Sequence, residues 1–172
     1  MSCYDMVTKH HLPRAWATLP EWMLQAAEEG KEFAQKCFTL TRYPRPMIKW
    51  YLGGPGWDFI GFVHLLDRNT VWLDASMRSF DEVLEVSAHE HAHALGGCED
   101  EDVPTLVGLM AVKNRREGTV YIHHGDLKYY WLPAGLTEIP SNAMVLEFED
   151  HDVGAYVNRG TGTRPLWRKV NL

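Results

Sequence analysis

The sequence predicts an α+β protein. A helical pattern near the start is followed by three short segments rich in aromatic and β-branched residues, and then by two further helical patterns and more extended chain. With 172 residues, the chain 1–172 is most simply one domain, long enough to bury a core. No internal repeat, low-complexity tract or linker divides it.

The first part of the chain reads as one helix and one small sheet. The helix is expected from Leu19 to Lys36, because apolar residues recur along one face and a proline suits the first turn. Strands are expected at residues 47–52, 59–66 and 70–75, with GGPGWD and DRN as the breaks between them. The third strand therefore comes directly before the next helix.

The helix expected from Phe80 to Leu95 has the clearest boundaries. Ser79 and Glu82 have the S-x-x-E spacing of a capping box, which satisfies backbone N–H groups at a helix start. The double glycine at 96–97 can adopt the left-handed turn that ends many helices.

The rest of the chain combines one more helix with extended segments. The helix is expected from Asp102 to Arg116. Segments 119–124, 127–132 and 143–148 are rich in aromatic and β-branched residues and are expected to be strands or extended chain. The tail from residue 151 reads as polar and irregular.

Composition limits the partners and the compartment. A net charge of −6 gives no reason to expect nucleic acid or an anionic membrane as a partner. The three cysteines form no CxxC pair, which fits a reducing compartment. No apolar stretch resembles a signal peptide or reaches the roughly 18–20 residues of a membrane span, so we expect a cytoplasmic protein.

The helix at residues 80–95 carries three histidines that separate by angle. A helix advances about 100° per residue, so His89 and His93 project from the same side, one turn apart. That side lies opposite the apolar face, and Glu90 lies on the flank between the two. His91 falls in the middle of the apolar face, so we expect it to be buried and hydrogen-bonded to a neighbour.

The pattern His89-Glu90-x-x-His93 indicates metal-assisted hydrolysis. Two imidazoles one turn apart can both bind a zinc ion at about 2.0–2.1 Å. Glu90 is then placed to accept a proton from the water that the zinc activates. The short pattern gains weight from its context, a capped amphipathic helix with strands just before it.

The segment HEHAHALGGCE resembles the active-site helix of the zincin metallopeptidases, and more narrowly of the metzincins. The metzincin pattern HExxHxxGxxH is matched at His89, Glu90, His93 and Gly96. Its last position is Glu99 in this chain, where the family has histidine or aspartate.

The resemblance implies more than the helix. In PSNAM, Met144 resembles the methionine that metzincins place in a tight turn below the metal. The implied zincin-like fold has a small, twisted, mixed sheet whose edge strand precedes the active-site helix, then a second helix and an irregular C-terminal part. Residues 70–75 would be that edge strand, along which an extended peptide binds.

The third metal ligand stays open. Glu99 has the metzincin spacing, and a carboxylate can complete a His₂Glu catalytic site. In a gluzincin-like arrangement the ligand comes from the following helix, for which Glu101 or Asp102 are the alternatives. These acids would otherwise only stabilise the positive end of that helix.

Two residues are candidates for stabilising the transition state. Zincins often give this role to a tyrosine or a histidine, which donates a hydrogen bond to the developing oxyanion. Tyr130 and His124 are the candidates in this chain.

The sequence therefore predicts a zinc-dependent endopeptidase that binds one zinc ion and a protein or peptide substrate. The alternatives are a gluzincin-type peptidase and a catalytically silent zincin-like module that binds a partner protein. Glu90 favours an enzyme, because a structural zinc site needs no base and usually has four protein ligands. Neither the substrate nor the oligomeric state follows from these residues.

Overall fold

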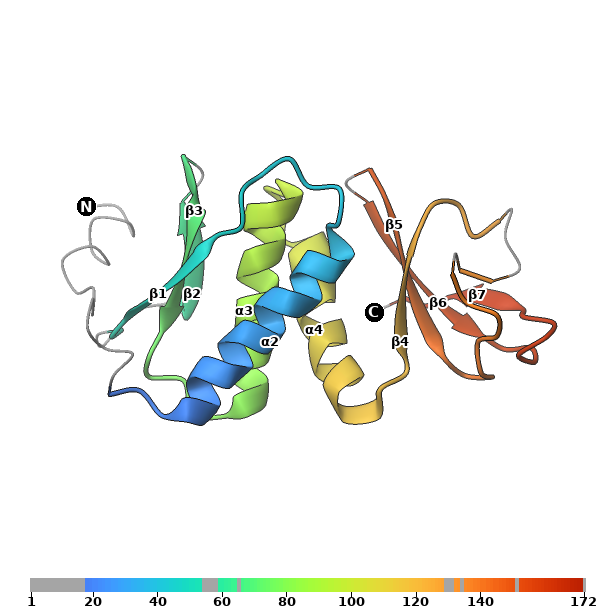
Figure 1. Cartoon of the computed structure of the whole chain (residues 1–172), viewed down its shortest axis with the longest axis horizontal. Coiled ribbons are helices and arrows are strands. Elements are labelled where there is room, and N and C mark those ends of the chain that lie inside the picture. The colour runs from blue at the N-terminus through green and yellow to red at the C-terminus, as the bar shows by residue number, and fades with distance from the viewer. Residues whose placement is uncertain are drawn as a thin grey trace. The chain divides into compact units, whose positions relative to one another are not determined.

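The computed structural model describes residues 18–53, 59–64, 66–128, 132–133, 135–150 and 152–171. In this part, the chain forms a mixed α+β fold with three helices and two mixed sheets, which confirms the predicted class (Figure 1). Its contacts divide it into two compact units, residues 1–112 and 113–172. The sequence analysis expected one domain, and no linker marks this division, which falls inside a helix.

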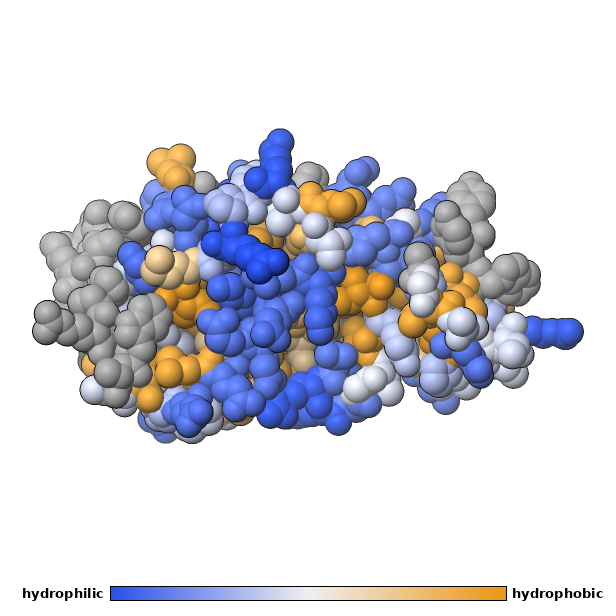
Figure 2. Space-filling view, in the orientation of Figure 1, coloured by the Kyte–Doolittle hydropathy of each residue, from blue (hydrophilic) through white to orange (hydrophobic). Residues whose placement is uncertain are grey.

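In the first unit, helix α2 (Glu21–Cys37) packs closely against the next helix along the chain. Its buried residues recur three or four positions apart. At Gly30, an added Cβ would lie 2.7 Å from the carbonyl oxygen of Leu84 and 2.8 Å from the backbone nitrogen of Ala88. Only glycine therefore allows this approach. Figure 2 shows hydrophilic side chains along the outward face of α2.

The sheet of the first unit contains β1 (Met47–Tyr51), β2 (Gly61–His64) and β3 (Asp67–Asp74) in the order β1-β3-β2. β1 is parallel and β2 antiparallel to β3. Two expectations are corrected. Residues 67–69 are strand rather than a break, and β3 is the central strand rather than the edge strand. Its last five residues, from Thr70 onward, are all buried, as expected of a strand with neighbours on both sides.

Helix α3 (Phe80–Gly96) begins where the sequence predicts and ends one residue later than predicted, within the double glycine. The Ser79 side chain accepts a hydrogen bond from the Glu82 backbone N–H, at 3.1 Å. The reciprocal half of the capping box is shifted by one residue, because the Glu82 carboxylate accepts from the N–H of Arg78. Gly97 has φ 66° and ends the helix in the left-handed conformation. α3 packs against α2 and also against β2 and β3 (Figure 1).

Helix α4 (Asp102–Glu117) follows and crosses the boundary between the units. At Gly108, in the first unit, an added Cβ would lie 2.8 Å from the carbonyl oxygen of Glu85 on α3. α4 therefore approaches α3 closely beside the histidines. No helix in the described residues is long and apolar enough to cross a membrane.

The second unit contains a four-stranded sheet, in the order β4 (Val120–His124), β5 (Met144–Glu149), β6 (Asp152–Asn158) and β7 (Trp167–Lys169). β4 and β5 are parallel, and the other pairs are antiparallel. The prediction of an irregular C-terminal part was therefore wrong, because β6 and β7 extend the sheet through backbone pairing. Of the expected segment 127–132, residues 127 and 128 form no strand, and 129–131 lie outside the described residues.

Candidate metal centre

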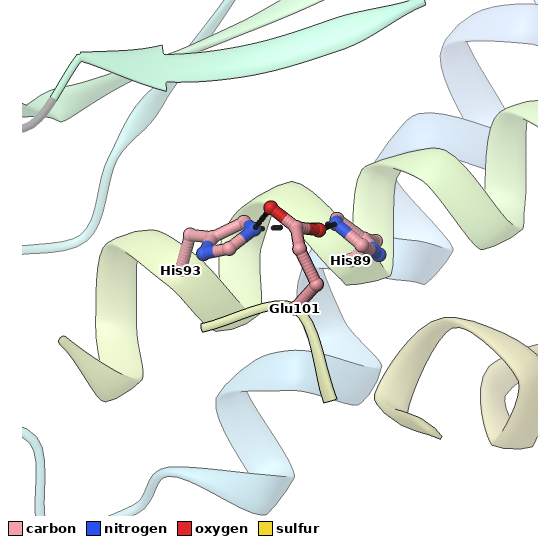
Figure 3. A group of neighbouring side chains, drawn as sticks. All are labelled: His89, His93 and Glu101. Carbon is pink, nitrogen blue, oxygen red and sulfur yellow. Dashed lines mark hydrogen bonds and ion pairs between the residues drawn. The ribbon is translucent and has the colours of Figure 1, made fainter. Parts of the chain in front are cut away.

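Two imidazole rings of α3 point toward one spot at the wall of a cleft (Figure 3). The Nε2 atoms of His89 and His93 are 3.2 Å apart. Their side chains are 22% and 16% exposed, so both rings reach solvent but are mostly packed in the protein. The two rings therefore share one side of the helix, as the angular spacing predicts.

The backbone holds His93 in the tautomer that a metal requires. The Nδ1–H of His93 donates a hydrogen bond to the carbonyl oxygen of Cys98, at 2.7 Å. A carbonyl can only accept, so the proton is on Nδ1 and the Nε2 lone pair of the neutral ring is free to bind a metal. The left-handed turn at Gly97 brings this carbonyl back toward the helix.

The surroundings of His89 favour its neutral form. Burial, and next the neighbouring His93, lower the pKa of His89, while Glu101 acts in the opposite direction. A neutral imidazole is the form that binds a metal. The environment of this ring therefore suits a ligand at neutral pH.

Glu101 supplies the third donor. It lies directly before α4, and its two carboxylate oxygens contact the two imidazoles (Figure 3). Oε2 is 2.9 Å from Nε2 of His89, and Oε1 is 3.4 Å from Nε2 of His93. The Glu101 side chain is 72% exposed, so it approaches the rings from the solvent side.

These donors fit a zinc ion. Atoms bound to zinc at about 2.0–2.1 Å in a tetrahedron lie roughly 3.3 Å from one another. The two imidazole Nε2 atoms are 3.2 Å apart, close to this spacing, and each lies near a different oxygen of the Glu101 carboxylate, at 2.9 Å for His89 and 3.4 Å for His93. Candidate ligand atoms of all three residues lie within 4.8 Å of one another. Two imidazoles and one carboxylate would leave a fourth position for water or substrate.

A fourth side chain, Glu90, lies beside this group in the wall of the same cleft. It is 8% exposed, and among the described residues no hydrogen bond contributes to the pKa of its carboxyl group. Burial, together with the charge of Glu101, raises the pKa of Glu90 to about 8. Its Cγ packs against Gly61 of β2, where an added Cβ would lie 2.9 Å away.

His91 turns away from the cleft, which confirms its predicted place in the core. It is fully buried, and its Nδ1–H donates to the Ser87 carbonyl at 2.7 Å. The Ser87 hydroxyl in turn donates to the carbonyl of Ala27 on α2, at 2.6 Å. Burial lowers the pKa of His91 to about 4, so the ring is neutral at pH 7. The Ser87 hydroxyl therefore joins α3 to α2 beside His91, and His91 is not part of the candidate metal site.

The cleft has a volume of about 650 Å³ and two kinds of wall. Phe62 and Val63 of β2, with Val86 of α3, are among its apolar lining, and the histidines and acids form the polar part. β2 is an edge strand of its sheet. The edge strand at this cleft is therefore 61–64, not 70–75 as the sequence analysis expected.

The other predicted site residues near α3 have separate positions. Glu99 is exposed and lines the cleft, but it is not one of the three residues that converge. Asp102 is exposed at the start of α4, and its N–H bonds to the Asp100 carboxylate. Gly96 is buried in the last position of α3, where an added Cβ would meet the ring of Phe38 at 2.7 Å.

The remaining predicted residues belong to the second unit. Met144 is buried and begins β5 after the turn at 141–142, so it lies in a strand rather than within a turn. His124 is exposed at the end of β4, with its ring centroid 6.0 Å from that of Phe148. Tyr130 lies outside the described residues.

Sequence reasoning missed two charged residues of the cleft, Glu85 and Arg68. Arg68 lies in β3, and its guanidinium donates to the carbonyl oxygen of His93 at 2.8 Å. It sits in the DRN stretch that the sequence analysis treated as a break. No local signal links this residue to a helix 25 positions later along the chain.

No protein-family model matches the chain, and no curated protein or solved structure is significantly similar to it. The geometry of the candidate metal centre is therefore the basis for proposing a function.

Proposed function

We propose that the protein is a zinc-dependent peptidase of the zincin type, in which His89, His93 and Glu101 hold the metal. One observation carries the proposal, namely the convergence of these three side chains on one point beside the buried carboxyl of Glu90. Three protein ligands with an acid next to them are typical of a catalytic zinc site, whereas a structural site usually has four ligands.

The third ligand favours the gluzincin-type alternative. Glu101 immediately precedes α4, so this ligand comes from the start of the following helix. The metzincin spacing instead selected Glu99, whose carboxylate does not join the group. A glutamate at the start of the next helix is the arrangement that the gluzincin comparison implies.

The residues around the site suit hydrolysis of an amide. A zinc ion bound there would act as a Lewis acid, polarising a carbonyl group and lowering the pKa of water. Glu90 would accept the proton of the attacking water and pass it to the leaving nitrogen. To do so it must be ionised, and a nearby divalent cation favours that form. The Cys98 carbonyl would keep His93 in the ligand tautomer throughout.

An extended peptide is the substrate that the cleft favours. An edge strand offers backbone N–H and C=O groups with which another chain can pair, and β2 lines the cleft beside the catalytic acid. Phe62 and Val63 would provide apolar contacts for its side chains. Main-chain pairing would position the peptide, and the apolar contacts with Phe62 and Val63 would select among its side chains.

Metal analysis combined with peptide hydrolysis tests the proposal. Wild-type protein and a control variant on the exposed face of α2, Glu28→Gln, should each hold about one zinc ion per chain. His93→Ala should lose most of it. Wild type should cleave members of a fluorogenic peptide library, and a chelator should stop the cleavage.

The possible outcomes separate the alternatives. If wild type prepared with added zinc holds no metal, the proposal is wrong. If it holds zinc but cleaves no peptide, the result favours the catalytically silent binding module.

A further inference from the structure

Arg68 is a cation in the wall of a cleft that is otherwise acidic. It is half-buried and, among the described residues lining the cleft, it is the only lysine or arginine. The cleft also contains four glutamates, at positions 85, 90, 99 and 101. An anion entering this cleft in the absence of Arg68 would meet four acids and, apart from the metal site, no positive charge.

The guanidinium of Arg68 is held in place without being neutralised. One N–H of the group donates to the His93 carbonyl at 2.8 Å. The group also stacks on the ring of Tyr43, with Cζ 5.0 Å from the ring centroid. No carboxylate in the described part of the chain forms an ion pair with it. A guanidinium has five N–H donors in a planar fork, so most of them stay available.

A simpler role for Arg68 is to cap α3. The carbonyls in the last turn of a helix lack intrahelical partners, and cations near them are favourable. Thr41 also caps the C-terminus of α3, because its hydroxyl donates a hydrogen bond to the Leu95 carbonyl. Capping requires one N–H of Arg68. It does not account for a guanidinium that faces a cleft next to a metal ligand.

We infer that Arg68 binds a carboxylate of the substrate, so that the cleft selects peptides with a carboxylate close to the bond that is cut. This inference rests on the proposed function. Arginine matches the planar carboxylate through two parallel N–H···O bonds, and the stacking on Tyr43 presents that fork in a fixed orientation. Because Arg68 contacts the backbone of His93, the bound carboxylate would lie near the reacting carbonyl.

The carboxylate has two sources, the free C-terminus of a peptide or an aspartate or glutamate side chain. Matched peptide pairs distinguish them. One pair has the same sequence with a C-terminal carboxylate or a C-terminal amide. The other pair is amidated and has glutamate or glutamine at one position near the cleaved bond.

The test compares kcat and KM of wild type, Arg68→Gln and Arg68→Lys on both pairs. Wild type should prefer the carboxylate member of one pair by roughly 10-fold or more in kcat/KM. Arg68→Gln should abolish that preference mainly through KM, and Arg68→Lys should retain part of it, because lysine keeps the charge without the fork.

Arg42→Gln is the matched control. Arg42 also stacks on Tyr43, at 5.4 Å, but it does not line the cleft. This variant should keep the wild-type preference. Thermal stability and zinc content are measured for every variant, since loss of a helix cap alone would lower stability without changing the preference.

Two results would overturn the inference. One is a wild-type enzyme that cleaves both members of each pair equally well. The other is an Arg68→Gln variant that is slower on all peptides by the same factor.

Binding provides a readout that does not need hydrolysis. If zinc-loaded wild type cleaves nothing, the proposed peptidase function fails, while fluorescence anisotropy with labelled versions of the same peptides still reports on Arg68. Tighter binding of the carboxylate member, lost in Arg68→Gln, supports the inference. Equal binding or no binding contradicts it.

Discussion

The two compact units bury polar side chains in different ways, as Glu90 and Asn158 show. In the first unit, Glu90 is almost fully buried but opens onto a cleft, and no hydrogen bond within the described residues fixes its carboxyl. In the second unit, Asn158 is completely buried, and its amide makes five hydrogen bonds to backbone groups. These bonds tie the end of β6 to the segment before β5 and to the loop between β6 and β7.

The difference separates a structural from a chemical use of burial. A buried amide with all its partners specifies one conformation, because each broken bond would leave a polar group unsatisfied. A buried acid such as Glu90, whose carboxyl has no hydrogen-bond partner among the described residues, has a shifted pKa and can exchange a proton with a molecule in the cleft. Substitutions of the two residues should therefore change different quantities.

The largest expected effect is on catalysis. Glu90→Gln should lower kcat by roughly 10²–10⁴-fold, because the amide cannot accept the proton of the attacking water. Zinc content and the free energy of unfolding should not fall, since the side chain keeps its size and loses a buried acid. Peptide hydrolysis, metal analysis and urea unfolding measure the three quantities, with Glu28→Gln as the control. If Glu90→Gln kept full activity, Glu90 would have no chemical role that distinguishes it from the structural Asn158.

The next largest effect is on stability. Asn158→Ala should lower the free energy of unfolding by about 2–4 kcal/mol, because buried N–H and C=O groups lose their partners. The exposed Asn171→Ala in the same unit should change it by less than about 0.5 kcal/mol. Chemical denaturation followed by circular dichroism measures both. If the two variants were equally stable, the network at Asn158 would not be structural.

A comparison of Glu101 and Glu99 tests which acid is the third ligand of the proposed metal site. Glu101→Gln should weaken zinc binding by roughly 10–100-fold, at least as much as the loss of a group that only orients a ligand. Glu99→Gln should leave the affinity within about 2-fold, since this carboxylate lies outside the converging group. Competition with a chromophoric chelator measures both affinities. The reverse order would restore the metzincin assignment of the third ligand.

The smallest expected effect concerns the turn at Gly97. Gly97→Ala should cost about 1–2 kcal/mol of stability, because φ is 66° and the added Cβ would lie 3.0 Å from the Tyr43 ring. Zinc affinity should also fall, since the turn carries the Cys98 carbonyl that orients His93. Gly118→Ala is the control, with φ 62° and open space around the added Cβ. It should be strained to a similar degree and keep its zinc affinity.

Local rules predicted α3 well. Its cap at Ser79, its end at Gly97 and the burial of His91 all follow from spacing along a single helix. The same spacing placed the two imidazoles on one side. Such features depend on residues within a few positions of one another, which a single sequence displays directly.

Features that depend on distant segments could not be read in the same way. The order β1-β3-β2 makes β2 an edge strand. This order depends on which strands pair with each other, and the residues of each strand do not indicate its partner. The choice of Glu101 over Glu99 depends on how the chain turns after Gly97 and how α4 approaches α3. β6 contains a glycine and β7 has three residues, so neither gives a strong strand signal.

The turn between α3 and α4, which carries the Cys98 carbonyl bonded to His93, would also change its local dynamics when a metal binds. A metal bound by His93 and Glu101 would join the last turn of one helix to the start of the next, and so close a short loop. Closing a short loop restricts the local opening of the segment within it. Amide hydrogen exchange at residues 97–102 should therefore slow down when zinc is added, which would make this turn a sensor of metal occupancy.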